Sequence, residues 1–129
     1  MTIGNNSLYK SPMPILNCPP LEAHDKDIEE VYRLTLNNPP TDEDFLSHIE
    51  ANKQYPPGKE CVASSVSVYK NKDDAEKLKK KIPAYKRHGF IAVGPIMAKS
   101  GVVLESTLSS HVDWWLYKGQ KVSHLFRVK

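Results

Sequence analysis

The sequence predicts an α+β fold, a single domain in which two or three helices accompany a mostly antiparallel sheet. Two observations support this class: strand-like and helix-like segments alternate in the first two thirds, and three or four strand-like segments follow in the last third. The chain has 129 residues, 40% of them hydrophobic, which suits one core. We expect a flexible N-terminal arm over residues 1–20 and a single α+β domain over residues 21–129.

The expected arm, MTIGNNSLYKSPMPILNCPP, carries four prolines and almost no periodicity, so no core should depend on it. The first strand is expected in EEVYRLTL, where β-branched and aromatic residues alternate between two faces. A helix from Asp27 to Leu36 is the competing interpretation of this segment.

Two helices are predicted from their start signals. TDEDFLSHIEANK, residues 41–53, has Thr41 as N-cap and Asp44 at the third helical position, which together form a capping box. NKDDAEKLKKKIP, residues 71–83, places acids in its first turn and lysines in its last, which complements the helix dipole. We expect Pro83 to end this second helix.

The remaining segments predict strands. CVASSVSVY, residues 61–69, places a row of small hydroxyl side chains on one face. FIAVGPIM, residues 90–97, is typical of a central strand, in which Pro95 implies a bulge or an edge. MAKSG is expected to turn the chain into GVVLEST, residues 101–107, as the return strand of a hairpin. Residues 122–128 alternate again and predict a closing strand.

The two cysteines, Cys18 and Cys61, lie far apart without a C-x-x-C motif, so their spacing supports neither a disulfide framework nor a zinc site. We expect two free thiols, with Cys61 partly buried at the start of a strand. The apolar runs are far shorter than the ~20 residues of a spanning helix, and the N-terminus lacks a signal-peptide pattern. We therefore expect a cytoplasmic protein with no membrane partner.

Charge is distributed unevenly along the chain. Residues 1–60 carry a net charge of −5 and residues 61–129 carry +8. Either the two halves face each other in the fold, or the basic half binds a polyanion such as nucleic acid. The competing interpretation of the basic residues is a solvated helix face, which is favoured over nucleic acid. These residues are Lys70, Lys72, Lys77, Lys79, Lys80, Lys81, Lys86, Arg87 and His88, with Tyr69 and Tyr85 among them.

The segment SSHVDWW, residues 109–115, concentrates the most chemistry. In a strand, His111, Asp113 and Trp115 share one face. An imidazole beside a carboxylate can act as a general base or hold a polar ligand, whereas the alternative is a capped turn with packed indoles. We expect no metal site, because H-x-D supplies two ligands without a second pair. No G-x-S-x-G motif indicates a catalytic triad.

The order of several motifs resembles a set of small uncharacterised bacterial proteins. These motifs are C-x-A-S-x-x-S-V-Y, a D-D-A helix, I-A-x-G, S-H-x-x-W-W and a closing F-x-V, and they cover residues 31–128. This resemblance implies no particular activity.

A fainter similarity is to ADP-ribosyltransferase-like folds. In that class an early arginine or histidine holds the nicotinamide nucleotide, a serine segment shapes the pocket, and a later glutamate acts on the ribose. Arg33, Ser65, Ser67 and Glu105 occur in this order. The serine segment is not S-T-S, and Glu105 lacks an acidic residue two positions before it. The resemblance implies NAD as cofactor; otherwise no cofactor is expected.

The favoured hypothesis is a small intracellular protein that binds a protein partner or a small ligand. The expected binding face is formed by Arg33, Ser65, Ser67, Asp113 and Trp115, together with His111. Under the enzyme alternative, Glu105 and His111 are the expected catalytic residues. The sequence alone does not decide between a binding protein and an enzyme.

Overall fold

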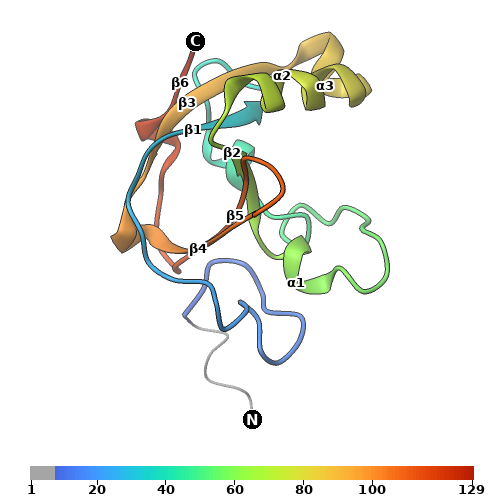
Figure 1. Cartoon of the computed structure of the whole chain (residues 1–129). Coiled ribbons are helices and arrows are strands. Elements are labelled where there is room, and N and C mark those ends of the chain that lie inside the picture. Colours follow the sequence, from blue (N-terminus) through green and yellow to red (C-terminus); the bar gives the residue numbers. More distant parts are fainter. Residues whose placement is uncertain (1–7) are drawn as a thin grey trace.

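The computed structural model describes residues 8–129 (Figure 1). These residues form one antiparallel sheet of six strands, in the order β4-β5-β2-β1-β3-β6, and three α-helices. The predicted α+β class is therefore confirmed. The elements are β1 (Ile28–Thr35), α1 (Glu60–Ala63), β2 (Val66–Tyr69), α2 (Lys72–Lys81), α3 (Pro83–His88), β3 (Phe90–Ile96), β4 (Gly101–Glu105), β5 (His111–Leu116) and β6 (Arg127–Val128).

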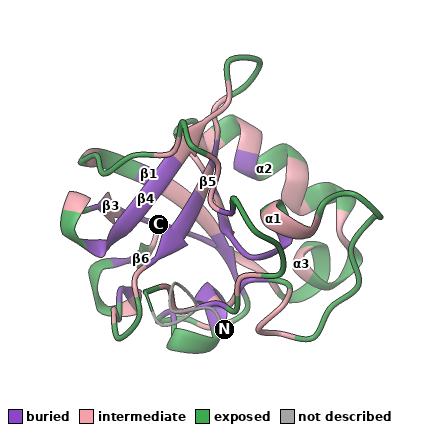
Figure 2. Cartoon of the chain, turned by 90° about the horizontal axis from the view of Figure 1, so that it is seen from below, coloured by how far each residue is buried: buried purple, intermediate pink, exposed green. Residues whose placement is uncertain are grey.

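The sheet curls around its apolar inner face. Strands β3 and β4 stand far apart in the strand order, yet only four residues connect them, so the sheet must bend back on itself. Buried residues are concentrated in the strands (Figure 2). Val31 of β1 and Val112 and Trp114 of β5 are completely buried in the inner core. Phe45 and Phe126 join this core, with their ring centroids 4.8 Å apart.

The outer face of the sheet is covered in two places, at opposite ends of the molecule in Figure 1. At one end, α2 packs on the outer face through Ala75, which is completely buried against Leu34 and Ile91, and Tyr85 of α3 joins the same cluster. At the other end, the N-terminal segment packs over β4 and β5, where Cys18 lies against Trp115. We call these the helical cover and the N-terminal cover.

The strand predicted in EEVYRLTL is confirmed as β1, and the competing helix is excluded. The strand predicted from Cys61 begins later, at Val66, because Glu60–Ala63 form the short helix α1. Cys61 therefore lies in a helical turn and not at the start of a strand.

The helix predicted from Thr41 is wrong beyond its first turn. The predicted capping contact exists, since the Thr41 N–H donates to Asp44 Oδ2 at 2.9 Å, but it opens only a 3₁₀ turn over Asp42–Phe45. A second capping box then begins a separate turn at Ser47. The Ser47 N–H donates to Glu50 Oε1, and the Glu50 N–H donates to Ser47 Oγ, both at 3.0 Å. Two local caps, at Thr41 and at Ser47, thus replace one continuous helix.

The second predicted helix is confirmed as α2, and Asn71 is its N-cap, with its side chain accepting from the Asp73 N–H. Pro83 ends α2 but also begins α3, a helix that the sequence did not predict. Proline suits the first helical position because its fixed φ is helical and its missing N–H has no partner there.

Strand β3 is confirmed, and the pairing between β1 and β3 shifts register between Ile28 and Val31, which agrees with the bulge predicted from Pro95. The predicted hairpin after β3 is wrong, because β4 pairs with β5 at the other end of the strand order. The closing strand is shorter than predicted, since Ser123–Leu125 form a 3₁₀ turn and only Arg127–Val128 pair with β3.

Cys18 and Cys61 form a disulfide, so the predicted free thiols are wrong. Their sequence separation of 43 hid this pairing, because separation along the chain says nothing about distance in the fold. Disulfides are more typical of oxidising compartments than of the cytoplasm. The cytoplasmic location therefore stays a prediction.

The predicted flexible arm contributes to the structure from residue 8 onward. Tyr9 forms a β-bridge with Tyr117, and Lys10 Nζ makes an ion pair with Glu50 Oε2 at 2.8 Å. Cys18 is only 5% exposed, so a core cluster does depend on this segment. Residues 1–7 of the predicted arm lie outside the described residues. Within residues 8–129, no helix has the length and apolar character needed to cross a bilayer.

Candidate functional site

Strand β5 carries the SSHVDWW cluster, and its two faces are as predicted. Val112 and Trp114 point into the inner core, where both are completely buried. His111, Asp113 and Trp115 share the outer face of β5, the strand that pairs with β2. The three outer side chains nevertheless meet different surroundings.

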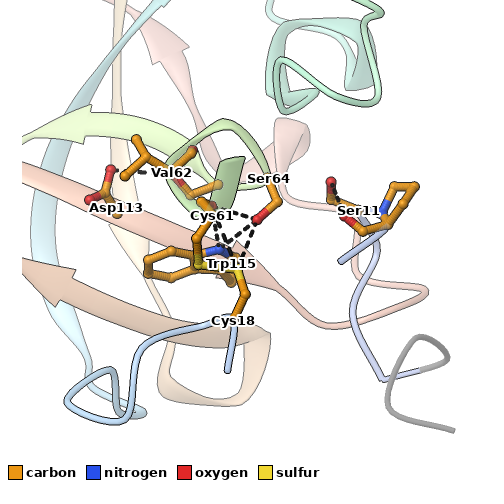
Figure 3. Close-up of a disulfide and its surroundings, with 9 residues drawn as sticks. Ser11, Cys18, Cys61, Val62, Ser64, Asp113 and Trp115 are labelled. Carbon is orange, nitrogen blue, oxygen red and sulfur yellow. Dashed lines mark hydrogen bonds between the residues drawn. A yellow bond between two sulfur atoms is a disulfide. The ribbon is translucent and has the colours of Figure 1, made fainter. Parts of the chain in front are cut away.

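Trp115 lies under the N-terminal cover, beside the disulfide (Figure 3). Its indole Nε1 donates to Ser64 Oγ at 3.0 Å and to the Cys61 carbonyl oxygen at 3.3 Å. The side chain is only 1% exposed, so no ligand can reach it without removing the cover. Trp115 is therefore a packing residue, and its predicted place in the binding face is wrong.

His111 and Asp113 stand closer to the helical cover, where they join two serines in a chain of polar contacts. His111 Nε2 lies 3.1 Å from Ser67 Oγ and 3.5 Å from Asp113 Oδ1, and Ser65 Oγ donates to Asp113 Oδ1 at 3.3 Å. Burial raises the pKa of Asp113, and His111 and Ser65 oppose this increase. Ser67 and Asp113 both approach the same imidazole nitrogen, unlike a catalytic triad, in which the acid holds the other nitrogen.

Strands β1 and β2 separate next to these serines. Within the described residues, Tyr32 opposite Tyr69 is the one register pair between the two strands. Beyond that pair, the side chain of Arg33 bridges the widening gap, because its Nη1 donates to the Ser67 carbonyl oxygen at 2.8 Å. Its Nε donates to the Asp44 carbonyl oxygen at 2.9 Å. A guanidinium thus replaces ladder hydrogen bonds between two strands.

A pocket of about 420 Å³ opens at this gap, under the helical cover. Apolar side chains from β1, α2 and the segment after Phe45 form one part of its wall, and hydroxyl and basic side chains form the rest. Its lining residues are Arg33, Leu34, Leu46, Ser47, His48, Lys53, Ser65, Ser67, Tyr69, Leu78, Ile82 and Tyr85. We call this the Arg33 pocket.

The charge of Arg33 has no carboxylate partner within residues 8–129. Asp44 offers it only a backbone oxygen, since the Asp44 carboxylate accepts from the backbone N–H groups of Leu36 and Thr41, at 2.8 and 2.9 Å. Burial lowers the pKa of Arg33, and Tyr85, Asp44 and Tyr69 only oppose this decrease. The guanidinium also lies over the Phe45 ring, 5.9 Å from its centroid.

Lys53 adds a second positive charge to the pocket, and His48 adds an imidazole. No Asp or Glu lines the pocket among the described residues. Burial lowers the pKa of His48, and Lys53 and Arg33 lower it further. The pocket is therefore electropositive and lacks an internal counter-charge.

The structure brings part of the predicted site together. Arg33, Ser65 and Ser67 line one pocket, and His111 and Asp113 adjoin it through their contacts with the two serines. The interpretation of His111 and Asp113 as site residues stays a prediction, with the pocket now beside them.

Glu105 stands apart from this pocket, and its side chain is absent from the lining. Its carboxylate contacts Lys26 Nζ and Lys70 Nζ, each at 2.6 Å, and these hydrogen bonds lower its pKa to about 2. The NAD-using alternative, which needs Arg33 and Glu105 at one site, therefore stays a prediction without a shared pocket for the two residues.

Sequence reasoning missed His48 and Lys53, because both lie in the segment that was predicted as a continuous helix. The S-x-x-E spacing from Ser47 to Glu50 was an available signal that the chain turns there. Tyr85 was considered only beside the basic residues as a nucleic-acid contact, and it lines the Arg33 pocket instead.

The basic residues of the nucleic-acid hypothesis are partly engaged within the chain. Lys70 pairs with Glu105, and Lys72 Nζ lies 3.9 Å from Glu76 Oε2. Tyr69 lines the Arg33 pocket and is not interleaved with lysines on an open surface. Nucleic-acid binding stays a prediction that no specific observation favours.

No protein-family model, no curated protein and no solved structure matches the chain. Among residues 8–129, no group of three or more His, Cys, Asp or Glu side chains is arranged to hold a metal ion. The geometry of the Arg33 pocket therefore carries the functional argument.

Proposed function

We propose that this protein binds a small organic anion in the Arg33 pocket. The observation that carries the proposal is a partly buried guanidinium that opens into a pocket of about 420 Å³ and has no carboxylate partner among the described residues. A pocket of this size lies within the range of about 300–1,000 Å³ that is typical of small-ligand sites.

Burial of a charge is unfavourable unless the charge is paired. A cation that leaves water without a counter-ion destabilises the fold, so such groups are usually paired. Arg33 uses Nε and Nη1 for two carbonyl oxygens, and its Nη2 group has no acceptor within residues 8–129. An anionic ligand would supply both the missing acceptor and the missing negative charge.

The apolar part of the wall indicates that the ligand also has an organic part. Leu78 of α2, Ile82 directly after α2 and Leu34 of β1 line the pocket and pack in one apolar cluster. Burial of an apolar group against these side chains would add to the affinity and would favour an organic anion over a simple inorganic ion.

A thermal-shift screen followed by calorimetry tests the proposal. Small carboxylates and phosphates that carry an apolar group should raise the melting temperature, because a ligand of the folded state stabilises it, whereas neutral analogues should not. Lys53→Gln, at the exposed rim of the pocket, should weaken binding about tenfold or less, as loss of a partly screened charge predicts. Lys86→Gln, an exposed lysine of α3 outside the lining, is the matched control and should leave binding unchanged.

Arg33→Met removes the charge at similar length and should abolish binding. Circular dichroism of this variant checks that it is folded, since it also loses two hydrogen bonds to carbonyl oxygens. The proposal fails if no anion in the screen binds, or if folded Arg33→Met and Lys53→Gln bind as tightly as the wild type.

A further inference from the structure

We infer that the ligand of the Arg33 pocket is a phosphate monoester that carries an apolar or aromatic group, rather than a carboxylate. This inference rests on the proposed function, because it specifies the head group of the proposed anion. It follows from the number of hydrogen-bond donors at the pocket, from the charge of its lining and from the nature of its apolar wall.

Donors without acceptors are gathered at the pocket. Within residues 8–129, no protein atom accepts a hydrogen bond from Arg33 Nη2, from Lys53 Nζ, or from the hydroxyls of Tyr69 and Tyr85, and the His48 ring has no hydrogen-bond partner. The tyrosine hydroxyls and the guanidinium are close enough for both tyrosines to influence the pKa of Arg33. Donors from β1, β2, α3 and the segment after Phe45 therefore line the same pocket.

The serine hydroxyls of the same pocket behave differently, because each already has a partner in the protein. Ser47 Oγ lies 2.7 Å from Ser11 Oγ, Ser65 Oγ donates to the Val62 carbonyl oxygen at 2.7 Å, and Ser67 Oγ contacts His111. These serine hydroxyls therefore need no ligand to satisfy them. The unpartnered groups are the basic residues and the two phenols.

A phosphate monoester matches this set better than a carboxylate does. A carboxylate presents two oxygens and one negative charge, whereas a phosphate monoester presents three terminal oxygens and a charge between about −1.5 and −2 at neutral pH. Arg33 and Lys53 supply two positive charges at the pocket, and Arg33 Nη2, which has no acceptor within residues 8–129, can donate to a phosphate oxygen. Both the charge and the number of acceptors therefore favour the phosphate.

The organic part of the ligand is indicated by the wall that α2 and α3 provide. Leu78, Ile82 and the ring of Tyr85 face the pocket, and a flat apolar group could pack between them and Tyr69. Inorganic phosphate would leave this wall uncovered.

Calorimetric titration with three probes tests the inference: phenyl phosphate, benzoate and inorganic phosphate. Phenyl phosphate and benzoate share a ring and differ in the head group, and inorganic phosphate lacks the ring. We expect phenyl phosphate to bind at least tenfold more tightly than either of the others. Tyr85→Phe, which removes only a hydroxyl, should weaken phenyl phosphate more than benzoate, and Lys86→Gln should weaken neither.

The outcomes separate this inference from the proposed function. Benzoate binding as tightly as phenyl phosphate would overturn the inference of a phosphate head group and leave the proposed anion site standing. Inorganic phosphate binding as tightly as phenyl phosphate would overturn the inferred organic part. Binding of none of the three, with no hit in the wider anion screen, would overturn both proposals.

Discussion

The two covers of the outer sheet face differ in how their polar groups are satisfied. Under the N-terminal cover, the one indole donor of Trp115 has two acceptors, Ser64 and Cys61, and a disulfide closes the contact. Under the helical cover, Arg33 has fewer acceptors than donors and no counter-ion among the described residues. Buried polar groups are satisfied almost everywhere in folded proteins, so this exception supports the proposal that the Arg33 pocket binds a ligand.

Strand β5 spans both regions, which explains why its sequence concentrates so much chemistry. Its Trp115 end belongs to the closed cover, and its His111 end adjoins the Arg33 pocket through Ser67. The SSHVDWW segment therefore contributes to two regions. Its Trp115 packs in a core cluster, and its His111 lies beside the pocket.

Alanine substitutions at the two ends of β5 should give very different losses of stability. Trp115→Ala should lower the free energy of unfolding by about 3–5 kcal/mol, as truncation of a fully buried aromatic residue does. His111→Ala should lower it by less than about 1.5 kcal/mol, because the net contribution of the hydrogen bond of this partly exposed ring is small. Urea unfolding of both variants measures the difference.

The same pair of variants should separate in ligand binding. We expect Trp115→Ala to keep its affinity for an anion at a temperature where it is folded, and His111→Ala to lose some, since Ser67 is no longer oriented. Equal losses of stability in the two variants would contradict the division of β5 into a closed end and an open end.

Removal of the disulfide should affect stability and leave the pocket intact. The double variant Cys18→Ser, Cys61→Ser should be less stable by about 2–4 kcal/mol, because the unfolded chain gains the freedom of a loop that spans 43 residues. Thermal unfolding of the wild type with and without a reductant provides the control and should show the same loss. A large loss of anion affinity in the folded variant would mean that the N-terminal cover also shapes the pocket.

Local patterns predicted β1, α2 and the faces of β5 correctly because alternation and capping are properties of neighbouring residues. The same reasoning missed α3, because Pro83 was taken only as a helix stop although it equally suits a first helical position. It also missed the pairing of β4 with β5, since a tight turn gave no information about which strand lies beside which.

The candidate site was predicted in part for a related reason. The expectation that Arg33, the serine row and His111 form one site stays a prediction, since Arg33 lies on the same face of β1 as the core residue Val31 and reaches the pocket through the gap between β1 and β2. The disulfide and the roles of His48 and Lys53 depend on contacts between distant segments. Such contacts leave no periodic signal, and the wrong helix from Thr41 concealed them.

The charge of Glu105 has two lysine partners and should stabilise the fold, unlike the charge of Arg33, which is unpaired within the described residues. Hydrogen bonds from Lys26 and Lys70 lower the pKa of Glu105 from 4.5 to about 2 in the folded protein. Stabilisation by this group is therefore complete above pH 4.5 and is lost as the pH falls toward 2. Glu105→Gln should destabilise the protein by about 1–2 kcal/mol at pH 7, because solvent screens the partly exposed lysines, and should cost almost nothing near pH 2.

Urea unfolding of Glu105→Gln at pH 7 and at pH 2.5, beside the wild type, measures this dependence on pH. The variant should bind anions as the wild type does, because a carboxylate already paired with Lys26 and Lys70 has no contact left to offer in a pocket that it does not line. A variant with unchanged stability and a tenfold loss of anion affinity would place Glu105 at the ligand. That result would mean that a carboxylate paired within the protein also contributes to ligand binding. It would support the NAD-using alternative, which needs Glu105 and Arg33 at one site.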